Sequence, residues 1–254
     1  FMINPFPGSD KTLYSTLFYP WTNPTAIALS TNQDLGAMFF SDNVATGRMV
    51  MGGIVGILLL AWVFKSADFR SNFDNILGGL VVGLAVLAAW YVTSNIAVNA
   101  DGEMMSLQTY VQEWDMYAPA DAVKPAAAGP LASQSFTFIN PMGQTLGYAA
   151  SGFDRTLLTF GIMALAGVIA GSLLWSLISR SFRIEWFAST GDFVNHLAGA
   201  ILMGFGGVLA MGCTIGQGIT GFSTLALGSI LTFIAIVIGS AATMKVQYFM
   251  MMRG

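Results

Sequence analysis

The chain of 254 residues is 55% hydrophobic and only 9% charged, and its mean hydropathy is +0.67. Because an average soluble domain has about a quarter charged residues, this composition excludes a soluble globular domain, a disordered chain and a collagen. The single cysteine excludes a disulfide scaffold, and the formal net charge of −3 gives no sign of nucleic-acid binding. The sequence therefore predicts an all-α integral membrane protein.

Residues 1–46 are polar and aromatic and contain four prolines, namely Pro5, Pro7, Pro20 and Pro24. We interpret them as an extramembrane leader segment. The sequence begins Phe1-Met2 and no secretory signal precedes it. We therefore expect part of a longer chain or a processed product, with a genuine amino terminus as the alternative.

Charge-free apolar windows follow the leader, and a helix that crosses about 30 Å of hydrocarbon needs about 20 such residues. Residues 47–98 are predicted to form a first helical hairpin, from windows at 49–64 and 76–98. Residues 156–254 are predicted to hold the remaining helices, from windows at 157–178, 193–211 and 225–244. The expected fold has about five transmembrane helices plus short re-entrant half-helices.

Basic residues set the predicted orientation, because short cytoplasmic loops carry an excess of Lys and Arg. They lie between the first two windows, after the third and in the tail, at Lys65, Arg70, Arg180, Arg183, Lys245 and Arg253. Residues 99–154, by contrast, have only Lys124 as a base among their acidic residues. Residues 1–46 and 99–155 are therefore predicted to be periplasmic, the latter as a loop or cap, and the carboxy terminus to be cytoplasmic.

The stretch between residues 204 and 221 is unusually rich in glycine, at Gly204, Gly206, Gly207, Gly212, Gly216, Gly218 and Gly221. Each glycine weakens a helix by about 1 kcal/mol relative to alanine and frees the backbone to bend near a ligand. Non-helical backbone at membrane depth is tolerated only inside protein or along a cavity. The stretch therefore predicts a broken segment whose helix ends present N–H groups to an anion.

The candidate substrate-binding residues all lie in this stretch: Cys213, Gly212, Thr214, Gly216, Gln217, Gly218 and Thr220. A thiol, hydroxyls, an amide and open main-chain donors together suit a soft sulfur anion. The alternative, that the lone cysteine is a small buried apolar residue, stays open. A formal G-x-G-x-x-G match at 216–221 lacks the later acidic residue of a dinucleotide site, and one Cys with one His cannot close a zinc site, so no cofactor or metal is expected.

Residues 203–229, with Gly-Cys-Thr-Ile-Gly-Gln-Gly-Ile-Thr-Gly-Phe-Ser at their centre, resemble the carboxy-terminal signature of the YeeE/YedE family. Segments 134–143, 182–187 and 192–196 also match, and the resemblance covers about residues 47–248. Members of this family are bacterial inner-membrane transporters of thiosulfate and related sulfur compounds. They have two pseudo-symmetric halves with one cysteine loop each, so this chain resembles the carboxy-terminal half of an inverted-repeat fold.

The resemblance implies a multi-pass transporter in the bacterial inner membrane that passes a thiosulfate-like anion by S–H···S hydrogen bonds, without covalent transfer. It also implies partners: membrane lipid, a first half supplied by another chain or region, a cytoplasmic sulfur-carrier protein, or a larger membrane complex. The alternative function is a non-transporting accessory subunit that retains the family fold. An enzyme is not expected, because the predicted spans contain no Asp, Glu or paired base for acid–base chemistry.

Overall fold

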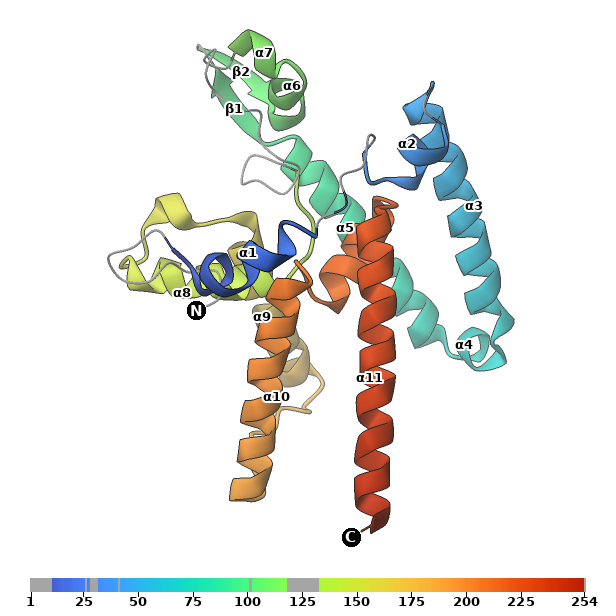
Figure 1. The fold of residues 1–254 in the computed structure, drawn as a ribbon, viewed down its shortest axis with the longest axis vertical. Coiled ribbons are helices and arrows are strands. Elements are labelled where there is room, and N and C mark those ends of the chain that lie inside the picture. Colours follow the sequence, from blue (N-terminus) through green and yellow to red (C-terminus); the bar gives the residue numbers. More distant parts are fainter. Residues whose placement is uncertain are drawn as a thin grey trace. The chain divides into compact units, whose positions relative to one another are not determined.

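The computed structural model describes residues 11–25, 27, 32–40, 42–100, 102–117 and 133–253 (Figure 1). Parts of the predicted leader and of the predicted cap at 99–155 therefore lie outside the described residues. The elements in chain order are a π-helix η1 (Tyr14–Phe18), α1 (Tyr19–Thr22), α2 (Leu35–Phe39), α3 (Val44–Lys65), α4 (Ala67–Ser71), α5 (Phe73–Ser94), β1 (Ala97–Ala100), β2 (Glu103–Ser106), α6 (Leu107–Gln112), α7 (Trp114–Tyr117), α8 (Ile139–Ala150), a 3₁₀ turn η2 (Arg155–Leu157), α9 (Phe160–Ile178), α10 (Thr190–Leu209), a π-helix η3 (Gly216–Gly221) and α11 (Leu227–Arg253). The predicted all-α membrane fold is confirmed, with one short hairpin added.

Five helices among the described residues are long and apolar enough to cross a membrane, namely α3, α5, α9, α10 and α11. The five predicted windows each fall on one of them. The second window extends too far, because α5 ends at Ser94 and not at residue 98. Asn95 closes that helix with its N–H directed to the carbonyls of Tyr91 and Val92, and the chain then enters β1.

The β1–β2 hairpin falls where the sequence predicts only an external loop or cap. Its strands pair antiparallel, from Ala97 opposite Ser106 to Ala100 opposite Glu103. The turn uses a glycine, because Gly102 has a φ of +91° and donates its N–H to the Asn99 side chain at 3.0 Å. A position with positive φ is one that glycine occupies without a steric penalty.

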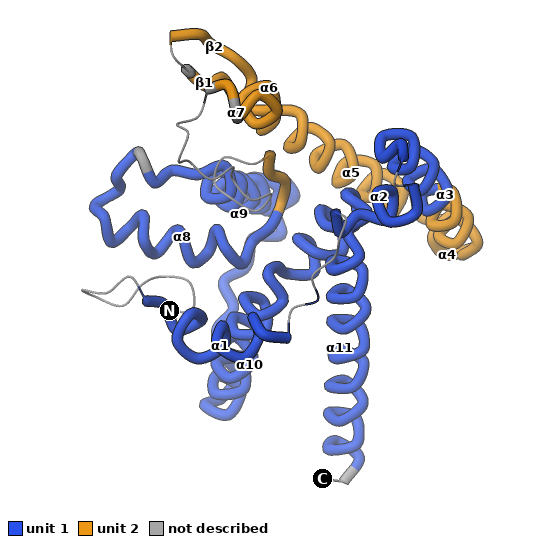
Figure 2. The backbone as a smooth tube through the Cα atoms, turned by 45° about the horizontal axis from the view of Figure 1, so that its top comes forward, with its two compact units in different colours: residues 1–56, 137–254 blue, residues 57–136 orange. Residues whose placement is uncertain are grey.

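Residues 57–136 form one compact unit and residues 1–56 with 137–254 form the other (Figure 2). In the smaller unit the buried Thr93 of α5 holds an incoming segment. Its hydroxyl donates to the Gln134 carbonyl at 2.7 Å and accepts the Gln134 N–H at 2.9 Å. One residue later, the Ser135 hydroxyl donates to the Val86 carbonyl at 3.2 Å. These hydrogen bonds fix residues 134 and 135 on α5, and the chain then continues at residue 137 into the larger unit, which contains the candidate site.

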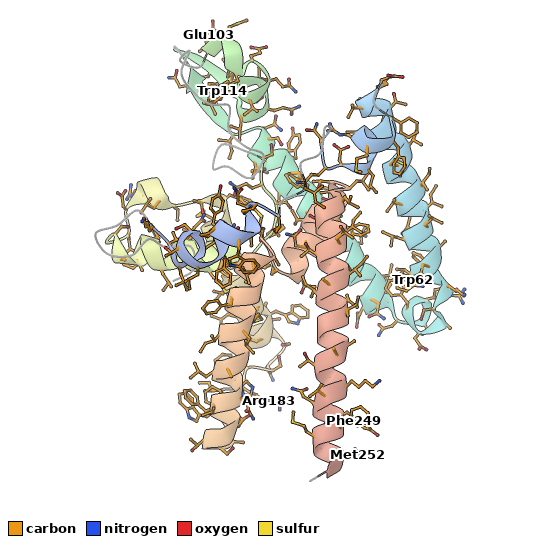
Figure 3. The ribbon with its side chains drawn as sticks, viewed as in Figure 1. Trp62, Glu103, Trp114, Arg183, Phe249 and Met252 are labelled. Atoms are coloured by element: carbon orange, nitrogen blue, oxygen red, sulfur yellow. The ribbon has the colours of Figure 1, made fainter. Side chains whose placement is uncertain are left out.

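The spanning helices keep most of their apolar side chains exposed within the described chain. The most apolar windows of α10 and α11 contain no buried residue at all. Figure 3 shows Phe249 and Met252 projecting away from the end of α11, and both side chains are more than half exposed. Because such surfaces are not stable in water, they must be covered by lipid or by other protein.

Candidate functional site

The α10 helix ends in a Schellman turn whose left-handed residue is a methionine. Met211 has a φ of +53° and donates its N–H to the Val208 carbonyl at 3.0 Å. The Gly212 N–H donates to the Gly207 carbonyl at 2.9 Å, which completes the pair of hydrogen bonds typical of this cap. The helix thus breaks inside the predicted stretch. Its reversal nevertheless falls on Met211, and no described glycine of the stretch has a positive φ.

Cys213 caps the short helical segment that follows this break. The segment runs over residues 214–223 and includes η3 (Gly216–Gly221). The Cys213 carbonyl accepts the Gln217 N–H at 2.8 Å, and its Sγ accepts the Gly216 N–H at 3.4 Å. The sulfur thus takes the acceptor role that a serine or aspartate oxygen has at most helix starts. The residue is half-buried, and a thiol that accepts through sulfur keeps its own proton to donate to a ligand.

Gln217 closes the break from within. Its side-chain Nε2 donates to the Ala210 carbonyl at 2.7 Å, one of the carbonyls left without a helical partner at the end of α10. Gly212 is buried beneath this side chain, and a Cβ built on Gly212 would lie 3.1 Å from Gln217 Cγ. The amide group that the sequence assigns to a ligand therefore already holds the two ends of the break together.

The remaining candidate side chains lie within the same segment. Thr214 is exposed beside the thiol, and Thr220 is half-buried one turn or more further along. No charged residue occurs between Phe193 and Met244, so this segment carries no side-chain charge of its own. The seven predicted residues thus all lie between the end of α10 and the end of η3, in a stretch where main-chain groups are the only dipoles besides the neutral polar side chains.

Most glycines of the segment serve close packing. An alanine Cβ at Gly216 would lie 2.6 Å from Thr137 Oγ1, and one at Gly218 would lie 2.5 Å from the Phe233 ring. Cβ atoms do not approach other heavy atoms that closely in real structures, so these positions accept only glycine without movement of a neighbour. The predicted role of glycine as a source of backbone freedom is therefore not what these two residues provide.

Residues 137–141 pack against the cysteine-bearing segment and its neighbouring helices, a role that the sequence motif at 134–143 did not reveal. Three of its residues each lie against a glycine of another element: Thr137 on Gly216, Ile139 on Gly207, and Pro141 on Gly161. The motif was visible as a family resemblance, but its contacts join positions far apart in the chain. We call residues 137–141 the strap, because they pack on both α10 and the short helix that follows it.

The far end of the segment is fixed by a second left-handed residue, Leu225. Its φ is +56° and only 8% of the residue is exposed. The Leu35 N–H donates to the Leu225 carbonyl at 3.1 Å, and the Leu227 N–H donates to the Gln33 carbonyl at 2.9 Å. A left-handed leucine persists only where surrounding contacts impose it, and here a two-bond antiparallel bridge does so.

Asp34 lies at the centre of this bridge, opposite Ala226. Its carboxylate accepts the Ala37 N–H at 2.8 Å as the cap of α2, and it accepts two hydrogen bonds from Arg48, from Nε at 3.1 Å and from Nη2 at 2.8 Å. The Arg48 guanidinium holds the pKa of this carboxyl below its usual range, against the opposing effect of burial. No sequence pattern singled out Asp34, because its partners are distant in the chain.

Two cavities of the larger unit lie away from this segment. One, of about 710 Å³, lies at the carboxyl end of α9 and is lined by Ser172, Ser176 and Arg183, the last labelled in Figure 3. The other, of about 340 Å³, lies at the start of α10 between Trp186 and Phe193. Neither cavity is lined by Cys213.

Comparisons with known proteins show the family of the chain. A family model described as sulphur transport matches residues 57–242, which includes the whole broken segment. The thiosulfate transporter TsuA of Escherichia coli (strain K12) is 31% identical over 80 residues, or 32% of this chain. The match spans 22% of that relative's length. No solved structure matches the chain.

Proposed function

This chain belongs to the sulphur transport family, and on that premise we propose that it moves a thiosulfate-like oxyanion across a membrane at the break between α10 and α11. The observation that carries the proposal is the position of Cys213. A half-buried thiol caps the short helix that connects two membrane-spanning helices. Interrupted helices at membrane depth are the usual means by which transporters build substrate sites.

The energetics explain why such a break is needed. An anion taken from water into hydrocarbon without new partners would cost tens of kcal/mol by Born solvation. Main-chain N–H groups at the start of the 214–223 segment, with the Thr214 hydroxyl and the Cys213 S–H, supply donors without a charged side chain. Neutral donors also keep binding weak enough for the ion to leave, as conduction requires.

Each candidate residue has a defined role in this proposal. Cys213 donates its S–H to the terminal sulfur of thiosulfate, and Thr214 donates to an oxygen. Gly212 and Gln217 fix the shape of the break, the latter by tying the short helix to the end of α10 through its bond to Ala210. Gly216 and Gly218 allow the strap and α11 to pack closely, so that the donors stay fixed, and the Thr220 hydroxyl is a further polar group for the anion.

We further propose that the protein lies in the bacterial inner membrane. The basic loops after α3 and α9 and the basic tail would face the cytoplasm, and residues 1–46 and 99–155 the periplasm. The exposed faces of α10 and α11 would be covered by lipid and by the first half of the pathway, as another chain or region. Docking of a sulfur-carrier protein on the cytoplasmic side is part of the same proposal.

Thiosulfate uptake tests the proposal in cells that have no other uptake system. Cys213→Ser keeps a small polar side chain but exchanges a soft donor for a hard one, and we expect it to reduce uptake strongly. Met203→Leu in α10, a volume-conserving change at an exposed position, is the matched control and should transport normally. Undiminished uptake by Cys213→Ser would remove the thiol from the mechanism.

The second candidate function is an accessory subunit that does not transport. It is favoured by the unburied windows of α10 and α11, whose apolar faces require covering by lipid or protein. In that case the chain would co-purify with a larger membrane complex, and Cys213→Ser would alter neither uptake nor assembly. The uptake experiment therefore separates the two candidates.

A further inference from the structure

The amino-terminal part of the larger unit holds the far end of the cysteine-bearing segment. We call Gln33–Phe39 together with Arg48 the clamp. Two main-chain hydrogen bonds join the clamp to the turn before α11, from the Leu35 N–H to the Leu225 carbonyl and from the Leu227 N–H to the Gln33 carbonyl. Both flank the bridge between Asp34 and Ala226. The turn that ends the 214–223 segment is therefore held by residues about 190 positions earlier in the chain.

The clamp is itself held by one ion pair. The Asp34 residue is 9% exposed, and its two carboxylate oxygens are used by Ala37 N–H and by Nε and Nη2 of Arg48. The helices α2 and α3 meet closely here, since a Cβ on Gly36 would lie 2.6 Å from the backbone nitrogen of Arg48. At this close approach the paired side chains join the start of α2 to α3, and so hold residues 33–35 where they bond to Leu225 and Leu227.

The left-handed backbone at Leu225 gives the independent sign that this turn is under constraint. A leucine with a φ of +56° is strained, and strain of this kind persists where neighbouring structure imposes it. Besides its packing on Thr137 and Phe233, the 214–223 segment is thus held by hydrogen bonds at both ends: through Gln217 to Ala210 at one end, and through Leu225 to the clamp at the other. Release of the Leu225 end would leave the segment held on fewer sides and would increase the movement of Cys213.

We propose that Asp34 and Arg48 are positioning residues for the cysteine-bearing segment: their ion pair keeps the clamp in the register that holds Leu225, and so sets the exposure of the Cys213 thiol. The relevance of this ion pair to transport rests on the proposed function. The effect of the ion pair on the exposure of the Cys213 thiol can be measured without any substrate.

The lone cysteine makes a direct test available. The full chain in membrane vesicles is treated with N-ethylmaleimide without thiosulfate, and the rate of labelling at Cys213 is followed. Asp34→Asn keeps the acceptor for the Ala37 N–H but loses the charge, and Arg48→Gln removes the partner. We expect each to raise the labelling rate by about tenfold, the low end for losing a charged hydrogen bond, since the guanidinium is half exposed.

The control variant is Asp42→Asn, which removes an exposed carboxylate close by in the chain and should leave the rate unchanged. The double variant Asp34→Asn/Arg48→Gln should react no faster than either single variant, because both remove the same interaction. Equal rates in the single variants and the wild type, or additive increases in the double variant, would overturn the proposal.

A second reporter separates positioning from general loss of folding. Ala89→Cys in a Cys213→Ser background places a thiol at a residue of α5 that is 5% exposed. Its labelling should not change when Asp34→Asn is added, and an equal increase there would show global unfolding and contradict the positioning role. If the wild type failed to transport thiosulfate, the proposed function would fall while the labelling result still decided the role of the clamp.

Discussion

Replacing Gly216 by alanine tests the packing between the strap and the cysteine-bearing segment. The new Cβ would lie 2.6 Å from Thr137 Oγ1 and 3.2 Å from Thr137 Cβ. Overpacking of this kind costs about 1–3 kcal/mol. A contact as short as 2.6 Å places the cost in the upper part of that range, about 2–3 kcal/mol. Alanine returns about 1 kcal/mol through its higher helix propensity, so we expect a net loss of about 1–2 kcal/mol in the free energy of unfolding.

The assay is thermal unfolding of the purified protein followed by tryptophan fluorescence. For a chain of this size each kcal/mol shifts the melting temperature by about 2–4 °C, so Gly216→Ala should melt about 2–8 °C lower. The labelling rate of Cys213 should also rise, because the Gly216 N–H donates to its sulfur. The lower melting temperature and the faster labelling would both result from the displaced contact between residue 216 and Thr137.

Three companion variants make the reasoning refutable. Gly206→Ala, at a glycine with no atom within 4 Å of the new Cβ, should melt at or above the wild-type temperature. The double variant Thr137→Ala/Gly216→Ala removes the atom nearest to the new Cβ and should recover most of the lost melting temperature. The double variant Thr137→Ser/Gly216→Ala keeps that oxygen and should not recover it. If Gly216→Ala melted like the wild type, or if both double variants behaved alike, the packing account would be wrong.

The other predictions concern contacts outside the strap. Asp34 should make the free energy of unfolding depend on pH, because the pKa of its carboxyl is lowered in the folded state. Its stabilising contribution is complete above about pH 4 and is lost as the pH falls through the lowered pKa. The melting temperature of Asp34→Asn should lack this decrease at low pH. Gly36→Ala, whose Cβ would meet backbone, should prevent accumulation of folded protein in membranes, whereas Gly53→Ala, with open space, should accumulate normally. Thr93→Val should lower stability by about 1–3 kcal/mol in denaturant titration, since it leaves buried main-chain groups of the docked segment unpaired. Gln217→Met should cost about 1 kcal/mol in the same titration and speed Cys213 labelling, because it frees the Ala210 carbonyl.

The sequence was sufficient for the spanning helices, because a membrane requires long apolar runs and those runs can be counted. All five predicted windows fall on helices of the structure. The error at the end of α5 has a local cause. Residues 95–98 are apolar enough to extend a window, but Asn95 caps the helix and the strands that follow pair with each other.

The position of the break was also predictable, since glycine-rich backbone weakens a helix. Its geometry was not. The two reversals fall on Met211 and Leu225, residues whose intrinsic preference is against a positive φ. The Met211 reversal is made by local hydrogen bonds of the Schellman turn, at a residue type that does not signal one. At Leu225 the conformation is imposed by hydrogen bonds with Gln33 and Leu35, far away in the chain, and no local pattern contains that information.

In the candidate site, too, some residues were predictable from the sequence and others were not. Cys213 and its neighbours were identified from residue type and from a family resemblance, and the structure brings them together in one segment. The residues that support them, Thr137 of the strap and Asp34 of the clamp, were not identified as such. Both act through long-range contacts, and an aspartate near a helix start is unremarkable in a sequence until its arginine partner is located.

The most direct test of the central claim is protection of Cys213 from alkylation by thiosulfate. The wild-type chain in membranes is labelled at a fixed pH with increasing thiosulfate, and with sulfate at equal ionic strength as the comparison. The account predicts that thiosulfate slows labelling of this thiol in a saturable manner and that sulfate, which lacks the soft terminal sulfur, has a smaller effect. A labelling rate that stays constant at every thiosulfate concentration would contradict the claim that the broken segment contacts the anion through its cysteine.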